Sequence, residues 1–285
     1  MKIFLSVDME GISGLVRWMD VAPQGIDFGR NRRLMTLDAN AAIEGAFAAG
    51  ASEVVVEENH GVEDLCVLLM DEIDPRCSVV RGAGRPGATC MSALDESVDL
   101  VMLVGHHAAA ASWPGIMAHT ISGGGFQAVR LRGRNIGEPD IFTIRAGEVG
   151  APVGLITGDQ MVIEQVRKRV PNVEAVQVKR ALGRQSGEVI PPPRAREAIF
   201  SGAKRAVERA ADRDFSPYVE EIAPYEIEID LRNPPDEAMR ANLAGLPEFE
   251  IVSERTIATQ APDMDVGFRR IAYLGYARTP GVTRY

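Results

Sequence analysis

The chain has 285 residues, 46% of them hydrophobic and 25% charged, which is typical of a globular protein with one large or two unequal domains. Its formal net charge of −9 argues against a nucleic-acid or anionic-membrane partner, because such partners need a basic patch. Three cysteines without C-x-x-C spacing, no signal-peptide pattern and no apolar run of about 18 residues predict a cytoplasmic protein with reduced thiols.

The first ten residues place two carboxylates at the end of an apolar strand. Residues 2–7 (K-I-F-L-S-V) predict a buried strand, and Asp8 and Glu10 follow it. Side chains two apart on a strand point to the same face, so both carboxylates can aim at one point. We expect a metal centre there. The alternative is that Asp8 caps the next turn and Glu10 is solvated.

A helix and a second strand follow. Residues 31–49 carry apolar and small residues at helical spacing, and Gly50 is a natural stop. Residues 53–56 predict a buried strand, and His60 lies just beyond it. Strand, helix and strand at this spacing predict a βαβ unit with a right-handed crossover.

The next segment predicts two more strands. A short helix is expected at 64–70 and a strand at 77–80, before a loop rich in glycine and proline at 82–87. Residues 98–104 predict another buried strand.

Three of the four histidines follow this last strand. His106 and His107 come directly after it, and His119 lies in a predicted loop at 109–125. Residues 126–135 predict a hairpin, because the turn G-R-N separates a strand pattern from the residues that follow.

Beyond the hairpin lies Glu138, and the α/β pattern then continues. A strand at 153–157, a helix capped by Asp159 and a strand at 173–178 complete the body. The predicted fold class is therefore α/β, with a mostly parallel sheet flanked by helices.

The last part of the chain has a different character. After three prolines and a long charged helix at 194–211, residues 225–231 alternate strictly between apolar and polar, as in an antiparallel or edge strand. Further elements are expected at 236–243, 248–252, 255–259 and 264–276. We predict an α/β catalytic domain at 1–212 and a smaller α+β module at 213–285, which can serve in assembly.

The histidines that follow strands point to metal chemistry. In open α/β sheets, ligands bind at the carboxyl ends of the strands, and Asp8, Glu10, His60 and the pair His106/His107 all sit at such ends. Imidazole and carboxylate without cysteine suit zinc, manganese or iron, with zinc the usual hydrolytic metal. Five candidate ligands favour two metals that share one carboxylate, and Asp8 on the strand end is the natural bridge.

Other catalytic motifs are absent from the sequence. It contains no G-x-G-x-x-G after the first strand, no P-loop, no H-E-x-x-H and no G-x-S-x-G. Cys90 has no local feature that would lower the pKa of its thiol and make it a nucleophile.

Several motifs together resemble those of the DppA-type zinc-dependent D-aminopeptidases. They are S-V-D-M-E-G-I-S-G at 6–14, G-x-H-A at 105–108, W-P-G-I-M-A-H at 113–119, I-G-E at 136–138 and V-P-N-V-E-A-V-Q-V-K at 170–179. The resemblance runs, with gaps, across most of the chain, and the opening motif is the most specific.

The resemblance implies a set of roles and an assembly. It implies two Zn²⁺ ions per subunit, with Asp8 as the bridge. Glu10 and His107 would complete one zinc, and His60 and Glu138 the other, although the doublet leaves His106 as the alternative to His107. His119 would be the catalytic histidine, and the assembly would be a ring-like homodecamer.

The expected activity is removal of N-terminal D-amino acids from short peptides such as D-Ala-D-Ala. His119 would act as general acid/base or stabilise the tetrahedral intermediate. Two alternatives remain open: a metal-dependent amidase or L-peptidase on the same scaffold, and a metal-stabilised assembly module without turnover.

Overall fold

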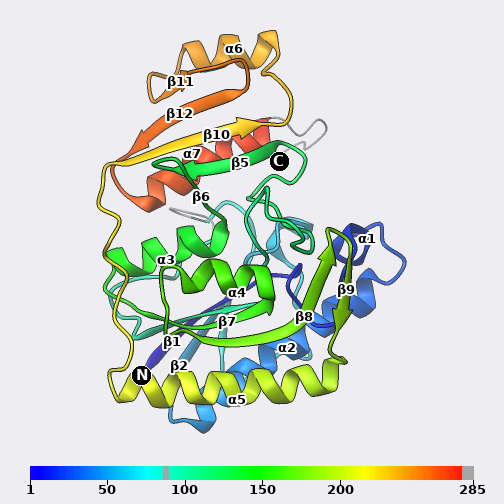
Figure 1. The fold of residues 1–285 in the computed structure, drawn as a ribbon. Coiled ribbons are helices and arrows are strands. Elements are labelled where there is room, and N and C mark those ends of the chain that lie inside the picture. Colours follow the sequence, from blue (N-terminus) through cyan, green and yellow to red (C-terminus); the bar gives the residue numbers. More distant parts are fainter. Residues whose placement is uncertain (86–89, 278–285) are drawn as a thin grey trace.

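The computed structural model describes residues 1–85 and 90–277, and a seven-stranded sheet forms its centre (Figure 1). The strand order is β3-β2-β1-β4-β7-β8-β9, in which the first six strands are parallel and β9 is antiparallel to β8. The bounds are β1 Lys2–Val7, β2 Glu53–Glu58, β3 Ser78–Val80, β4 Leu100–Val104, β7 Val153–Asp159, β8 Glu174–Gly183 and β9 Ser186–Val189. The predicted mostly parallel sheet is confirmed.

Helices cover both faces of this sheet (Figure 1). One face packs on α2 (Phe28–Ala48) and α5 (Pro192–Ala211), which also pack on each other. The other face packs on α3 (Glu138–Glu148) and α4 (Gln160–Arg167). Parallel strands buried on both faces are expected to be apolar throughout, and β4 is fully buried along its length.

The alternation of β1 decides which way Asp8 points. Ile3 and Leu5 belong to the core beside α2 and α5, whereas Phe4 belongs to the core beside α3 and α4. Ser6 shares the face of Phe4, since side chains two apart on a strand point the same way. The same alternation turns Asp8 toward the side of the sheet covered by α3.

A second, antiparallel sheet lies beyond α3 (Figure 1). Its strand order is β11-β12-β10-β5-β6, and its bounds are β5 Phe126–Leu131, β6 Arg134–Asn135, β10 Tyr225–Leu231, β11 Phe249–Ile251 and β12 Thr256–Ala261. Helices α6 (Glu237–Ala244) and α7 (Met264–Ala277) accompany it. The phenyl rings of Phe142 on α3 and Phe268 on α7 lie 6.4 Å apart and join the two parts.

The strict alternation predicted for 225–231 is confirmed. Tyr225, Ile227, Ile229 and Leu231 are buried, while the residues between them are exposed or half-buried. The predicted hairpin at 126–135 also forms, and it pairs with β10 as part of the second sheet. The second sheet thus takes strands from both sides of residue 213, and the division of the chain at that point stays a prediction.

The short helix expected at 64–70 is wrong, because only one 3-10 turn forms, at Glu63–Leu65. Asp64 and Leu65 have positive φ values of 52° and 60°, which stop an α-helix. The amides of Val67 and Leu68 donate to the buried carboxylate of Glu58 instead of to helical carbonyls. Of the predicted loop at 82–87, residues 86–87 lie outside the described residues.

Three elements were not predicted: α1 (Trp18–Val21), α3 and β9.

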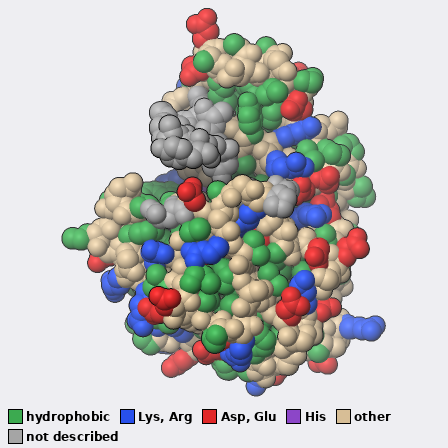
Figure 2. Space-filling view, turned by 180° about the vertical axis from the view of Figure 1, so that it is seen from behind, with side chains coloured by type: hydrophobic (Ala, Val, Ile, Leu, Met, Phe, Trp, Pro, Cys, Tyr) green, Lys and Arg blue, Asp and Glu red, His purple; other side chains and the backbone are tan. Residues whose placement is uncertain are grey.

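Within the described residues, no helix combines the length and the apolar character that a membrane crossing requires. On the face seen in Figure 2, acidic and basic side chains are interspersed, in line with the mixed charge of the sequence.

Candidate metal centre

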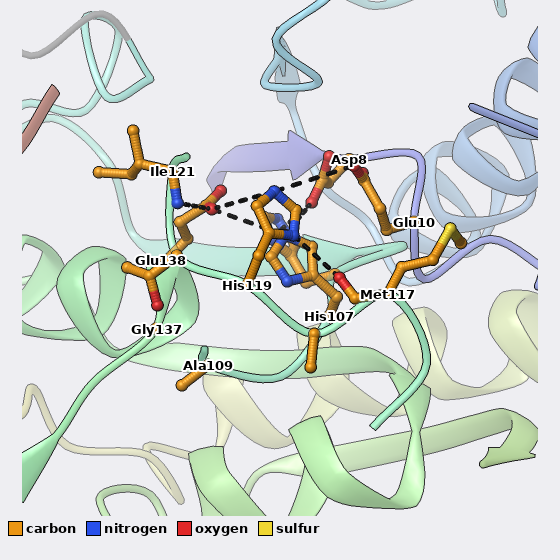
Figure 3. A network of polar contacts seen from close by, with 12 residues as sticks. Asp8, Glu10, His107, Ala109, Met117, His119, Ile121, Gly137 and Glu138 are labelled. Carbon is orange, nitrogen blue, oxygen red and sulfur yellow. Dashed lines mark hydrogen bonds and ion pairs between the residues drawn. The ribbon is translucent and has the colours of Figure 1, made fainter. Parts of the chain in front are cut away.

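Six side chains from different elements meet at the carboxyl ends of β2, β1 and β4 (Figure 3 shows five of them). Candidate ligand atoms lie within 4.8 Å of one another in each of two groups of three. The first group is Asp8, Glu10 and His60, and the second is His107, His119 and Glu138. Every site residue predicted from the sequence is therefore in this cluster.

A glycine brings the loops after β1 and β4 together. A Cβ atom on Gly11 would lie 2.1 Å from the carbonyl oxygen of His106, so only glycine permits this approach. The Gly11 amide donates to the carbonyl of Gly105 at 2.6 Å. The glycine that follows Glu10 in the opening motif therefore fixes the distance between two ligand-bearing loops.

In the first group, His60 is held in one orientation. Its Nε2–H donates to the Val21 carbonyl at 2.8 Å, and its Nδ1 lies 2.9 Å from Glu10 Oε2 and 3.6 Å from Asp8 Oδ1. Burial would lower the pKa of His60, but the carboxylates of Glu10 and Asp8 raise it well above its usual value. Burial would raise the pKa of Glu10, but His60 holds it well below its usual value. A metal ion can replace the proton on Nδ1, and a carbonyl on the other ring nitrogen is typical support for a histidine ligand.

In the second group, both imidazoles present Nε2 to the carboxylates. His107 Nδ1–H donates to the Ala108 carbonyl at 3.0 Å, and its Nε2 lies 3.6 Å from Glu138 Oε1. His119 Nε2 lies 4.0 Å from Glu138 Oε1 and also 4.0 Å from Glu10 Oε1. The two rings stack with centroids 4.0 Å apart (Figure 3).

Asp8 lies between the two groups. Its Oδ1 accepts from the Met9 amide at 2.8 Å and faces His60, whereas its Oδ2 lies 3.3 Å from His107 Nε2. Oδ2 is buried and has no hydrogen-bond partner among the described residues. An unpartnered buried carboxylate oxygen costs free energy, and a cation would satisfy it. The donor set therefore fits a pair of metal ions that share Asp8.

The structure also separates the two adjacent histidines. His106 is fully buried, with Nε2 2.8 Å from Ser6 Oγ, and Asn59 Nδ2 donates to that same hydroxyl at 2.6 Å. Burial lowers the pKa of His106 to about 4, so its imidazole is neutral. His106 Nδ1 also lies 3.7 Å from Asp8 Oδ2, but of the two histidines only His107 belongs to a group of candidate ligands.

Glu138 reaches the centre from the first turn of α3. The Gly137 amide donates to Asp140 Oδ2 at 2.8 Å, which caps the helix, and Glu138 Oε1 accepts from the Ile121 amide at 2.7 Å. Burial, with smaller contributions from Asp8 and Glu10, raises the pKa of Glu138 to about 7. The sequence G-E-P-D, with proline in the first turn and a capping aspartate, is the signal that could have predicted this helix.

The cluster is most open on the side of His119. Its side chain is 12% exposed, against 1–8% for the other five. The indole of Trp18 is half-buried and packs edge-on against the His119 ring at 5.3 Å. Burial, followed by the neighbouring His107, lowers the pKa of His119. Substrate access is therefore expected past Trp18 and His119.

Sequence reasoning missed one supporting residue, Lys179 on β8. Its Nζ donates to the carbonyls of Glu10, Ile12 and Leu15 at 2.5, 3.1 and 2.7 Å and so holds the loop that carries Glu10. Burial lowers the pKa of Lys179 to about 8. Alternation along V-Q-V-K puts Lys179 on the outward face with Gln177, so nothing in the sequence indicates its burial; the β7–β8 pairing shifts register at this point.

Comparisons with known proteins place the chain among aminopeptidases. Residues 1–273 match the family Peptidase_M55, described as D-aminopeptidase. A D-aminopeptidase of Bacillus subtilis (strain 168) is 31% identical over 195 residues, which cover 68% of this chain and 69% of that protein. A solved structure described as "Zn-dependent D-aminopeptidase DppA from Bacillus subtilis, a self-compartmentalizing protease" superposes with a TM-score of 0.89 at 27% identity, over 98% of this chain and 99% of that one.

Proposed function

Because this chain belongs to the M55 family of D-aminopeptidases, we propose that its two residue groups hold a pair of zinc ions for the hydrolysis of short peptides such as D-Ala-D-Ala. The chain is a zinc-dependent D-aminopeptidase. The observation that carries the two-zinc proposal is the direction of the Asp8 carboxylate, with one oxygen toward each group.

The distances support one grouping of the ligands. Glu10 and His60 would share the first zinc with Asp8, because His60 Nδ1 lies 2.9 Å from Glu10. His107 and Glu138 would share the second with Asp8, because His107 Nε2 lies 3.3 Å from Asp8 and 3.6 Å from Glu138. This grouping differs from the pairing implied by the sequence resemblance, which joined Glu10 with His107. Three residues would then hold each zinc, the number of protein ligands typical of catalytic zinc.

The chemistry divides between metal and protein. When bound, a zinc pair supplies Lewis-acid polarisation and makes a water molecule acidic near neutral pH. His119 would supply a proton acceptor. Its Nδ1–H donates to the Met117 carbonyl at 2.9 Å, so its Nε2 carries no proton and faces the centre. In peptide hydrolysis, His119 would take a proton from water and return it to the leaving amine as the C–N bond breaks.

The proposed function is tested by substrate chirality and metal removal. We expect the purified enzyme to hydrolyse D-Ala-D-Ala and to leave L-Ala-L-Ala intact. Activity should disappear after complete zinc removal by a chelator and return on addition of zinc, because the nucleophile depends on the metal. Both rates are measured by amine release, with zinc content determined in parallel. D-Ala-D-Ala hydrolysis that persists in zinc-free enzyme would contradict the proposal.

A self-assembled enzyme is part of the same proposal. The B. subtilis structure is described as a self-compartmentalizing protease, and the sequence resemblance implies a homodecamer. We therefore expect light scattering to give a mass near ten copies of the 30.8 kDa chain. A monomer at micromolar concentration would overturn this part of the proposal without affecting the zinc assignment.

A further inference from the structure

The turn between β8 and β9 reaches the loop that carries His119, although the two segments lie far apart in sequence (Figure 1). The Met117 amide donates to the carbonyl of Arg184 at 2.8 Å. The Arg184 guanidinium, through Nη2, donates to the carbonyl of Ala118 at 2.9 Å. Arg184 therefore binds the peptide groups on either side of the Met117–Ala118 peptide, directly before His119.

The conformation of Met117 sets the direction of the His119 ring. Met117 is fully buried and has a φ of 49°, a left-handed value that a non-glycine residue rarely adopts. In this conformation its carbonyl accepts from His119 Nδ1 at 2.9 Å (Figure 3). A carbonyl can only accept, so the proton is on Nδ1, and the neutral imidazole presents a bare Nε2 to the centre.

The rest of the loop is fixed on either side of this point. The Ile116 amide donates to Asp159 Oδ2 at 2.8 Å, and the His119 amide donates to the Ala108 carbonyl at 3.1 Å. Between these two anchors, Met117 and Ala118 are bound by Arg184. The strained peptide that orients His119 is thus held from the edge hairpin of the sheet.

We propose that Arg184 is a positioning residue that fixes the tautomer and the direction of His119. The inference rests on the proposed function, in which His119 Nε2 accepts the proton. Without the guanidinium, the Ala118 carbonyl loses its donor and the left-handed conformation of Met117 can relax. His119 then loses the acceptor for Nδ1–H, and its Nε2 is no longer aimed at the centre. Misplacement of a catalytic group by about 1 Å can lower a rate by about a hundredfold.

The experiment compares Arg184→Met, Arg184→Lys and a matched control, Arg180→Met. Methionine keeps the apolar stem without the donor, and lysine restores one donor. Arg180 lies on the same hairpin and pairs with Glu188 on the surface, away from His119. For each variant, kcat and KM for D-Ala-D-Ala and zinc per subunit are measured. Ring-¹⁵N NMR reports the tautomer directly, and four histidines keep the spectrum simple.

For Arg184→Met we expect kcat to fall about tenfold or more, while KM and zinc content stay unchanged. The NMR spectrum should show a second tautomer of His119 beside the Nδ1–H form. Arg184→Lys should recover part of kcat, and Arg180→Met should match the wild type. An unchanged kcat in Arg184→Met, or an equal loss in Arg180→Met, would overturn the inference. If His119→Ala itself keeps full turnover, the proposed role of His119 fails instead, so the two failures are distinguishable.

Discussion

Replacing Asp8 by asparagine is expected to remove both zinc ions and to lower turnover of D-Ala-D-Ala by about 10³-fold or more. Asparagine has nearly the same shape, and its Oδ1 can still accept from the Met9 amide. The position that faces His107 becomes an NH₂ group, however, which cannot bind a cation. Because Asp8 would belong to both metal sites, one substitution should empty both. Zinc per subunit is measured after dialysis in metal-free buffer.

Two neighbouring variants provide graded controls for this result. His107→Ala should remove about one zinc, since Glu10 and His60 still hold the other with Asp8. His106→Ala should keep both, because His106 bonds to Ser6 and lies outside both ligand groups. Asp8→Asn that retains two zincs would refute the shared-ligand arrangement. Zinc loss from His106→Ala together with full zinc in His107→Ala would reverse the assignment of the doublet.

Replacing His119 by alanine is expected to lower kcat by about 10²–10⁴-fold while zinc content stays unchanged. The reason is that the five proposed ligands contact one another without His119, whereas its Nε2 would be the proton acceptor on the open side of the centre. The measurement is kcat for D-Ala-D-Ala alongside zinc per subunit.

His119→Asn gives the sharper version of this test. The asparagine amide can still donate to the Met117 carbonyl, as Nδ1 does, but it has no counterpart of Nε2. If proton transfer through Nε2 is the function, His119→Asn should be as impaired as His119→Ala. Near wild-type turnover in His119→Asn would show that the ring serves only to hold the loop.

A large part of the architecture could be predicted because it depends on local pattern. The apolar run at 2–7 specifies a buried strand, and strict alternation at 225–231 specifies a strand with one face exposed to solvent. Period-2 geometry also placed Asp8 and Glu10 on one side, and the structure brings them together. Local pattern failed at 64–70, where no α-helix forms. The amides of Val67 and Leu68 donate to the buried carboxylate of Glu58 instead of to helical carbonyls.

By itself, then, the sequence determined which strands end in imidazoles and carboxylates, and through them the α/β class and the metal-binding character of the site. Only the tertiary structure decided how those groups combine. Whether His106 or His107 joins the group of candidate ligands, and whether Glu10 meets His60, depends on contacts between loops some 50 to 100 residues apart in sequence. The same holds for the support that Lys179 and Arg184 give to the loops of Glu10 and His119. Periodicity describes neighbours along the chain, whereas these contacts arise only when the sheet has placed its strands side by side.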